Sequence, residues 1–261
     1  MNYVDLHTHL AWGIDDGYQT REEAIKGLEI LNQQGTVAVV ATPHFIPSKQ
    51  DYKTVQEMNL RIDELRILAK DYDVQVVRGC ELFLNDSFLE FVEEGLANRI
   101  NHSKYILVEF NVTKKLGNEE VVEDRLYELS VRQMTPVIAH VERYFHEGVD
   151  IERVRSWVEQ GYVIQMNVSS ILGKHGSTIK NNCFKLLDEG LVHIVSSDTH
   201  SPTGGRSPRM EEACKLIEKE YGKENAIKLF YDNAIHVIKN EEVVNLTKVE
   251  KSFFKKLFRK G

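Results

Sequence analysis

The chain has 261 residues, of which 42% are hydrophobic, and its formal net charge at pH 7 is −7. This length and composition suit one α/β barrel domain with a large core, and the acidic balance argues against a general nucleic-acid partner. Three cysteines without CxxC spacing fit a reducing cytosol and not a disulfide framework. The N-terminus lacks a signal pattern and no apolar run is long enough to span a bilayer, so we expect a cytoplasmic protein.

Short apolar runs rich in β-branched residues alternate with helical patterns along the chain. The predicted strands cover residues 3–6, 36–41, 74–77, 105–108, 136–139, 162–166 and 192–196. The run at 36–41 is continuously apolar, which is typical of a parallel sheet covered on both faces. Seven strand–helix units predict a single-domain α/β fold over residues 1–240, a TIM-like parallel barrel with one unit fewer than the usual eight.

Several predicted helices have recognisable features. Thr20 and Glu23 form a capping box that opens the first helix. Further helices are expected over roughly 54–70 and 86–98, and Pro208 is expected at the first position of a final helical region. The helix over 54–70 is expected to turn three leucines inward, Leu60, Leu65 and Leu68.

Two histidines follow the first strand with one residue between them. In an extended chain residues i and i+2 point to the same side, so His7 and His9 can converge on one ion. Other histidines and carboxylates follow the later strands, namely His44, Glu81, Glu109, His140, Asp198 and His200. Barrel enzymes place their active sites at this face. Imidazoles with carboxylates and without thiolate suit zinc, iron or manganese, and the carboxylates favour manganese. The sequence therefore predicts a metal centre there.

Some reactive residues are expected to lie outside this centre. Asp15, next to Asp16 in the turn after the first strand, is expected to shape that turn. His193 is expected to be packed, and the remaining histidines are expected to be solvated, His102, His146, His175 and His236. A nucleophilic cysteine that attacks phosphate needs a glycine-rich loop with an arginine, and no cysteine here has that setting. Cys80 is therefore expected to be a packing residue.

Four motifs of the chain resemble those of the PHP family of metal-dependent phosphoesterases: DLHTH at 5–9, TPH at 42–44, AHVER at 139–143 and SDTH at 197–200. Within that family the chain looks most like the bacterial capsular and exopolysaccharide tyrosine phosphatases. The closer marks are DDG at 15–17, YILVEF at 105–110 and PVIAH at 136–140. The resemblance extends from residue 5 to about residue 240. Val141 departs from it, because the family usually has proline after the histidine.

The resemblance implies a distorted seven-stranded PHP barrel that holds up to three metal ions, commonly manganese, with iron, zinc or magnesium as other candidates. It would place the first ion on His7, His9, Glu81 and Asp198. Glu81 would bridge to a second ion, which Glu109 and His140 would also hold. Asp16, His44 and His200 would hold the third. Nine donors are too many for one ion, and bridging carboxylates let neighbouring ions share ligands.

The implied activity is that of a metal-dependent protein-tyrosine phosphatase acting on a membrane-associated bacterial tyrosine kinase that regulates capsular or exopolysaccharide synthesis. Arg143 and Arg206 are candidate clamps for the phosphate oxygens, and Asp16 completes the catalytic set. Three alternatives stay open. One is a small-molecule phosphatase, such as histidinol phosphatase, which a closed pocket would favour, whereas a shallow mouth would favour the protein phosphatase. Another is an amidohydrolase, which would normally show a bridging lysine where Glu81 stands. The third is a non-catalytic module that binds a phosphorylated partner.

Residues 241–261 form a predicted tail, in which the segment 249–261 mixes lysines and an arginine with phenylalanines and a leucine. On a helix the apolar residues of 249–261 fall on one face, which is the pattern of an interfacial helix. The same segment could instead pack on the flank of the barrel. Attraction to anionic lipid is worth roughly 1 kcal/mol per basic residue. The first interpretation therefore predicts weak contact with the inner face of the membrane.

Overall fold

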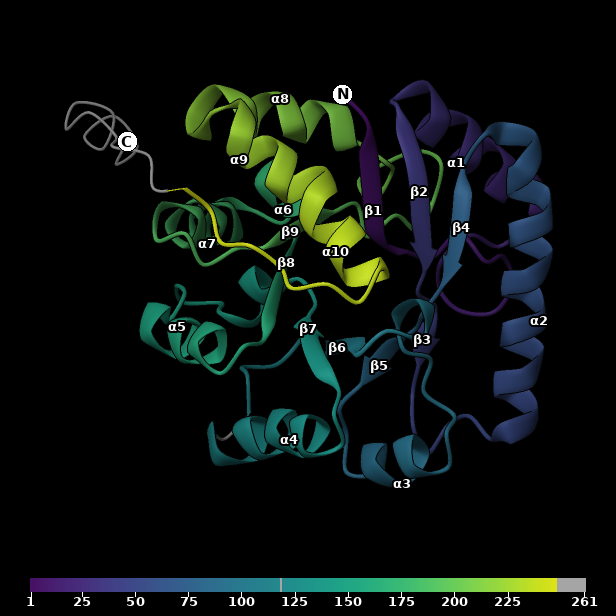
Figure 1. The fold of residues 1–261 in the computed structure, drawn as a ribbon, viewed down its shortest axis with the longest axis horizontal. Coiled ribbons are helices and arrows are strands. Elements are labelled where there is room, and N and C mark those ends of the chain that lie inside the picture. Colours follow the sequence, from purple (N-terminus) through teal and green to yellow (C-terminus); the bar gives the residue numbers. More distant parts are fainter. Residues whose placement is uncertain (118, 248–261) are drawn as a thin grey trace.

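The computed structural model describes residues 1–117 and 119–247 (Figure 1). Within them the strand pairs are parallel and form two groups, β1-β2-β4 and β3-β5-β6-β7-β8-β9. The strands are β1 (Tyr3–Thr8), β2 (Thr36–Ala41), β3 (His44–Phe45), β4 (Gln75–Arg78), β5 (Glu81–Phe83), β6 (Tyr105–Glu109), β7 (Thr135–Ile138), β8 (Val163–Asn167) and β9 (Ile194–Ser196). A parallel bridge between Thr8 and Thr199 closes the chain after β9 onto β1. The predicted seven-stranded parallel barrel is confirmed.

Two of the seven barrel strands are each split into two segments. β2 continues into β3 after a break that contains Pro43, and β4 continues into β5 after a break that contains Gly79. Proline has no N–H to offer a neighbouring strand. A Cβ on Gly79 would lie 2.8 Å from Val40 Cγ1, so glycine allows this close approach. Beyond the breaks, β3 and β5 pair with His44 opposite Glu81. The breaks therefore set two predicted metal ligands side by side.

Helices lie outside the strands, with α2 along β4 and α10 beside β1 (Figure 1). Their bounds are α1 (Arg21–Gln33), α2 (Tyr52–Leu68), α3 (Phe88–Glu93), α4 (Glu119–Val131), α5 (Ile151–Glu159), α6 (Val168–Ile171), α7 (Ser177–Asp188), α8 (Met210–Tyr221), α9 (Lys223–Ile227) and α10 (Asn233–Ile238). The capping box of α1 is present. Thr20 Oγ1 accepts a hydrogen bond from Glu23 N, and the Glu23 side chain accepts one from Thr20 N.

The inward face of α2 differs from the prediction at one leucine. Leu65 and Leu68 are buried, as expected, but Leu60 is 63% exposed. The buried stripe runs through Met58 and Ile62, and a residue two positions from either of these points to the other side of a helix. The prediction for Leu60 is therefore wrong.

Two predicted helix ends are also wrong. Pro208 does not occupy the first helical position, because α8 begins at Met210. The carbonyl oxygen of Pro208 accepts a hydrogen bond from Gln34 Nε2 at 2.8 Å, which ties the proline into the preceding loop. The helix expected over 86–98 ends at Glu93, since Gly95 follows with a φ of 71°.

The floor of the barrel beneath the carboxyl ends of the strands is apolar. It is built from inward side chains of β1, β2, β6, β7 and β9, including Leu6, Val40, Leu107, Val137 and Ile194, which are fully buried. A larger apolar cluster fills the space between the strands and helices α4, α5, α7 and α8, with Trp157 fully buried in it. The core thus lies below and around the candidate site and shares few side chains with it.

Residues 241–247 lie against the barrel. The Asn233 side chain donates to Val244 O and accepts from Val244 N, each at 2.8 Å, and Asn225 Oδ1 accepts from Thr247 N at 2.9 Å. Leu246 is nearly buried. The beginning of the predicted tail is therefore packed on the barrel, whereas the predicted interfacial segment, 249–261, lies outside the described residues.

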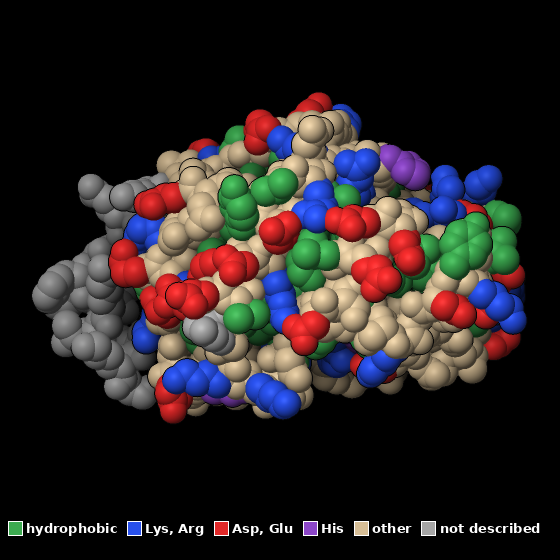
Figure 2. All heavy atoms as spheres, turned by 90° about the horizontal axis from the view of Figure 1, so that it is seen from below, with side chains coloured by type: hydrophobic (Ala, Val, Ile, Leu, Met, Phe, Trp, Pro, Cys, Tyr) green, Lys and Arg blue, Asp and Glu red, His purple; other side chains and the backbone are tan. Residues whose placement is uncertain are grey.

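The surface reflects the acidic composition. Figure 2 shows carboxylate side chains spread over one face of the molecule, with lysine and arginine side chains between them. Across residues 1–117 and 119–247, no helix combines the length and the apolar content that crossing a membrane would require.

Candidate metal centre

The fold brings all nine predicted ligands together at the carboxyl ends of the strands. Three groups have donor atoms that lie within 4.8 Å of one another: His9, Asp16, His44 and His200; His7, His9 and Asp198; and His44, Glu81 and Glu109. His140 joins them through Nε2, which lies 2.9 Å from Glu81 Oε1 and 3.7 Å from Glu109 Oε2. Eight of the nine side chains are at least four-fifths buried, and Asp16 is 63% exposed. The site is therefore a buried cluster with one open side.

Glu81 stands at the middle of this cluster and is fully buried. Its Oε2 atom lies 3.1 Å from His7 Nε2, 3.3 Å from His9 Nε2 and 3.1 Å from His44 Nδ1. Burial alone would raise the pKa of this carboxyl. The charges of His7 and His44, and the hydrogen bond from His140, nevertheless hold its pKa well below the usual range. Glu81 therefore stays ionised, and its carboxylate faces several imidazole nitrogens at once. A carboxylate that bridges two metal ions would have such surroundings.

The orientation of His7 and His9 leaves two nitrogen lone pairs facing one another. Nδ1 of His9 lies 2.7 Å from Asp15 Oδ2, and Nδ1 of His7 lies 3.3 Å from Gln165 Oε1. These acceptors favour a proton on each Nδ1. In the neutral imidazoles, the form that binds a metal, the two Nε2 atoms are then unprotonated and lie only 3.1 Å apart. Two such lone pairs directed into one space suit a shared cation.

The histidines on the open side have opposite pKa shifts. Burial lowers the pKa of His44, but the charge of Glu81 and the close carboxylates of Asp16 and Glu109 outweigh it and raise the pKa to about 12. Burial and the charge of His9 lower the pKa of His200 to about 4. The close imidazoles of His200 and His44 hold the pKa of Asp16 far below its usual range. Because imidazole binds a metal only when neutral, metal uptake at His44 would displace a proton.

Asp198 connects the cluster to both predicted clamp arginines. Arg206 Nη2 donates to both carboxylate oxygens of Asp198, at 3.0 and 3.1 Å. Arg143 Nη1 lies 3.6 Å from Asp198 Oδ2. Both guanidinium side chains are partly exposed, at 20% and 34% for Arg143 and Arg206. Two cations therefore stand on the accessible rim, next to a carboxylate of the cluster.

The donor set fits divalent metal ions. Several of its buried atoms have no hydrogen-bond partner among the described residues, including Glu81 Oε2, His44 Nδ1 and His200 Nε2. Buried polar atoms of native proteins are normally satisfied. Imidazole nitrogens and carboxylate oxygens without thiolate are ligands of zinc, iron and manganese. A cation held here would satisfy these atoms and balance the carboxylates.

Two buried supporting residues were missed by reasoning from the sequence. Asp15 does shape its turn, since Oδ1 accepts from Gly17 N at 2.9 Å, but its Oδ2 also orients His9. Gln165 Oε1 accepts from His140 N at 2.8 Å, and its Nε2 donates to Asn167 Oδ1 at 2.9 Å. The available signal for Gln165 was a polar amide that follows two apolar residues in β8, two residues before the strand end.

The residues set aside from the site mostly behave as predicted. His193 is packed: Nδ1 accepts from Ile164 N at 3.0 Å. Cys80 is fully buried, which raises the pKa of its thiol. His102 and His146 are exposed. His175 and His236, expected to be solvated, are only partly exposed, and His175 Nε2 lies 3.0 Å from Ser169 Oγ.

Comparisons with known proteins place this geometry among its relatives. The sequence model described as "Capsular polysaccharide synthesis, CpsB/CapC" matches residues 3–239. The tyrosine-protein phosphatase CpsB of Streptococcus agalactiae serotype III is 31% identical over 92% of this chain and 100% of its own length. The tyrosine-protein phosphatase YwqE of Bacillus subtilis is 28% identical over 92% of this chain and 93% of its own length.

A solved structure gives the same relationship at the level of the fold. It comes from work on YwqE of Bacillus subtilis and CpsB of Streptococcus pneumoniae, described as metal-dependent tyrosine phosphatases. It superposes with a TM-score of 0.76 over 95% of this chain and 99% of its own, at 24% sequence identity. With the family model matching nearly the whole barrel, the chain belongs to the CpsB/CapC family.

Proposed function

We propose that this protein is a metal-dependent protein-tyrosine phosphatase. The observation that carries the proposal is the juxtaposition of nine imidazole and carboxylate groups with two rim arginines, Arg143 and Arg206, that reach Asp198. The relatives named as tyrosine-protein phosphatases in Streptococcus agalactiae and Bacillus subtilis support the substrate class.

The proposed ligand sets are the ones that the family resemblance implies, and the groups of neighbouring donor atoms in the structure overlap them in part. His7, His9, Glu81 and Asp198 would hold one ion. Glu81 would be shared with a second, held by Glu109 and His140. Asp16, His44 and His200 would hold a third. We propose manganese, because ligand sets that combine carboxylates with imidazoles favour a harder ion than zinc. Bound divalent ions supply Lewis acidity toward the phosphoryl oxygens and lower the pKa of water.

The chain's own residues bind and orient the phosphate. Arg143 and Arg206 each present a planar guanidinium that can bind two phosphate oxygens. Asp198 holds Arg206 in place through two hydrogen bonds until the substrate arrives. The pKa of the Asp16 carboxyl lies far below its usual range, so Asp16 is an anion at neutral pH and serves as a ligand, not as an acid. A tyrosine leaving group, with a pKa of about 10, needs no strong acid.

The open side of the cluster favours a protein substrate over a small one. Asp16 and Arg206, on the rim, are 63% and 34% exposed, while His7 and His9 beneath them are inaccessible. A phosphotyrosine side chain can reach such a rim from the surface of another protein. The alternative, a small-molecule phosphatase such as histidinol phosphatase, would be expected to enclose its substrate in a closed pocket.

The physiological substrate that we propose is a membrane-associated bacterial tyrosine kinase that regulates capsular or exopolysaccharide synthesis. The phosphatase would act on this kinase in the cytoplasm. The description of the matching family, capsular polysaccharide synthesis, supports this setting. Residues 249–261, with their interleaved basic and apolar side chains, would add weak contact with an anionic membrane. Co-sedimentation with anionic liposomes at low and high salt, with and without residues 249–261, tests the contact; an intact protein that stays in the supernatant at low salt would contradict it.

A phosphate-release assay tests the function. The purified protein with manganese should hydrolyse a phosphotyrosine peptide much faster than histidinol phosphate, and should lose activity when a chelator removes the metal. Full activity in excess EDTA after dialysis would exclude metal dependence. A preference for histidinol phosphate would replace the protein substrate with the small-molecule alternative.

A further inference from the structure

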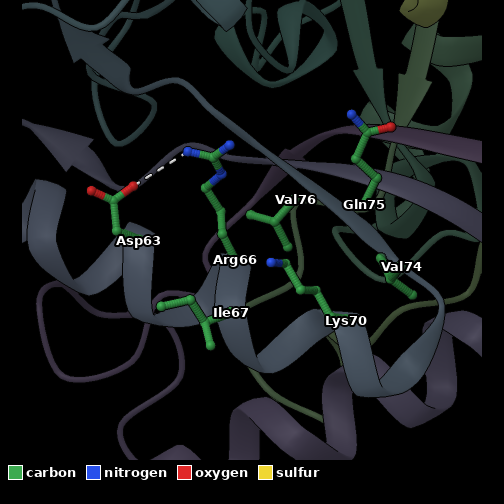
Figure 3. A pocket seen from close by; sticks show the side chains of 7 residues that line it. All are labelled: Asp63, Arg66, Ile67, Lys70, Val74, Gln75 and Val76. Atoms are coloured by element: carbon green, nitrogen blue, oxygen red, sulfur yellow. Dashed lines mark hydrogen bonds and ion pairs between the residues drawn. The ribbon is translucent and has the colours of Figure 1, made fainter.

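A groove lies between the C-terminal half of α2 and β4, away from the metal centre. Its main cavity has a volume of about 530 Å³ and is lined by Asp63, Arg66 and Ile67 of α2 and by Lys70 of the 3-10 turn Ala69–Tyr72 that follows α2. Figure 3 shows Asp63 and Arg66 joined by an ion pair on the helix, with Val76 and Gln75 on the strand side. A second cavity of about 360 Å³ shares Asp63 and Arg66 and extends the groove to Arg78.

The groove is positively charged in an acidic protein. Three cationic side chains, Arg66, Lys70 and Arg78, line it against one carboxylate, Asp63, which leaves an excess of two positive charges. Asp63 is shared, since Oδ1 lies 3.5 Å from Arg66 Nη1 and Oδ2 lies 2.7 Å from Arg78 Nη2. Lys70 forms no ion pair with any residue in the described part of the chain. The net charge of the whole chain is −7, so this local excess is not a reflection of composition.

One wall of the groove is an edge strand. β4 is the last strand of the group β1-β2-β4, and the next barrel strand, β6, pairs with β5. Between β4 and β6 lies the short 3-10 segment Ile100–His102, which contacts both. In a parallel pair, alternate residues direct their peptide groups away from the partner strand. On the side away from β2, β4 therefore presents peptide groups beside the groove, and natural proteins usually cover such edges.

We propose that this groove binds an acidic, extended segment of a protein substrate, which pairs with β4 as an added strand while its carboxylates contact Arg66 and Lys70. The inference rests on the proposed phosphatase function. An extended peptide between an edge strand and a helix is an established mode of recognition, in which backbone pairing supplies affinity and side-chain pockets supply selectivity. Ile67, 68% exposed on the same helix, offers an apolar contact between the two cations.

The position of the groove makes it a docking site separate from the site of hydrolysis. Six residues of nearly continuous strand connect Gln75 in the groove to Glu81 in the metal centre, a distance of about 20 Å. The docked segment and the phosphotyrosine must therefore be separated by at least about six residues of extended chain. Docking would lower KM for a substrate that carries both elements and leave kcat unchanged.

Two phosphotyrosine peptides test the proposal. One carries alternating glutamate and valine about ten residues from the phosphotyrosine, and the other carries glutamine in place of glutamate. The wild-type protein should show a KM that is about three- to tenfold lower for the glutamate peptide, the range expected for two exposed charge pairs. The variant Arg66→Glu/Lys70→Glu should lose this preference and keep its kcat for phenyl phosphate, since both residues lie outside the metal centre.

A matched control is available on α8. Lys215→Glu/Lys219→Glu makes the same change in charge at the same spacing of four residues, on an exposed helix surface. It should keep the preference for the glutamate peptide. Equal KM values for the two peptides in the wild type, or loss of the preference in the α8 variant, would overturn docking at this groove.

Fluorescence anisotropy of the unphosphorylated glutamate peptide separates docking from catalysis. Binding by the wild type and not by the Arg66→Glu/Lys70→Glu variant would support docking in the groove. This conclusion would hold even if neither peptide nor phenyl phosphate were hydrolysed, because the lack of hydrolysis would contradict only the proposed phosphatase activity. Proline in place of the valines should abolish binding, because proline cannot pair as a strand. If the proline peptide and dextran sulfate bind as tightly as the glutamate peptide, the groove is a site for polyanions and the strand pairing is overturned.

Discussion

His9 and Asp15 are joined by a 2.7 Å hydrogen bond between Nδ1 and Oδ2. The same Oδ2 accepts from the backbone N–H of His44 at 3.1 Å, and Oδ1 accepts from Gly17 N at 2.9 Å. One carboxylate therefore fixes an imidazole, the start of β3 and its own turn. In the adjacent position, Asp16 faces the open side of the cluster. Of the two neighbouring aspartates, Asp15 thus orients residues of the centre, whereas Asp16 faces the cluster itself.

Replacing Asp15 with asparagine should weaken metal binding. Asparagine can still accept from Gly17 N, so the turn should persist, but it does not offer His9 a charged acceptor. Loss of such a supporting acceptor typically costs about 10- to 100-fold in metal affinity. Manganese titration followed by activity, with circular dichroism to check the fold, measures the effect. An unchanged manganese requirement would limit Asp15 to shaping the turn.

The ligand set was predictable because it obeys two rules that operate on sequence alone. Strand C-termini of a parallel barrel meet at one face, and each of His7, Glu81, Glu109 and Asp198 follows an apolar run. The supporting contacts obey no such rule. The contact of Asp15 with His9 depends on how a six-residue loop folds back. That of Gln165 with His140 depends on the register between β7 and β8.

The outer surfaces were harder to predict for a related reason. Apolar periodicity places Leu65 correctly, but it also admits Leu60, which lies two residues from the buried Ile62 and is exposed. Pro208 is held in the loop before α8 by a hydrogen bond from Gln34, which lies 174 residues earlier in the chain. Local sequence contains no information on a partner at that distance.

Substituting His140 by alanine should abolish turnover and leave the fold intact. The imidazole contacts Glu81 at 2.9 Å and Glu109 at 3.7 Å, whereas the apolar floor of the barrel lies below it. Phosphate release with manganese present and thermal unfolding would be measured in parallel. The variant His146→Ala, which replaces an exposed histidine six residues further along the chain, is the control and should remain active. A His140→Ala protein with near-normal kcat would show that the ligand assignment is wrong.

Arg143→Ala should reduce kcat/KM for a phosphotyrosine peptide by about 100-fold or more, the usual effect of removing a preorganised charge donor. Metal content should change little, because Arg143 contacts Asp198 only at 3.6 Å. Arg143→Lys should restore part of the activity, since lysine lacks the planar fork. Arg209→Ala, which removes an arginine paired with Glu212, is the matched control. Equal kcat/KM values for Arg143→Ala and the wild type would make Arg143 a structural residue.

His193 should make folding stability depend on pH in the acidic range. Burial lowers its pKa to about 4 in the folded protein, partly offset by the hydrogen bond to Asn245, compared with about 6.5 in the unfolded chain. The unfolded state therefore takes up the proton first. The resulting stability is fully present above pH 6.5 and is lost as the pH falls toward 4.

His193 therefore changes the free energy of unfolding by about 3 kcal/mol over this pH range. Its pKa differs by about 2.5 between the folded and the unfolded chain, and a difference of one in pKa corresponds to 1.36 kcal/mol. His193→Gln cannot take up this proton, so its free energy of unfolding lacks this loss at acidic pH. The gap in the free energy of unfolding, wild type minus variant, should fall by about 3 kcal/mol between pH 7 and pH 4. Urea unfolding of both proteins at several pH values, with EDTA present throughout, measures the gap, and pH-dependent groups common to both proteins cancel. A gap that stays constant from pH 7 to pH 4 would show that His193 contributes through packing alone.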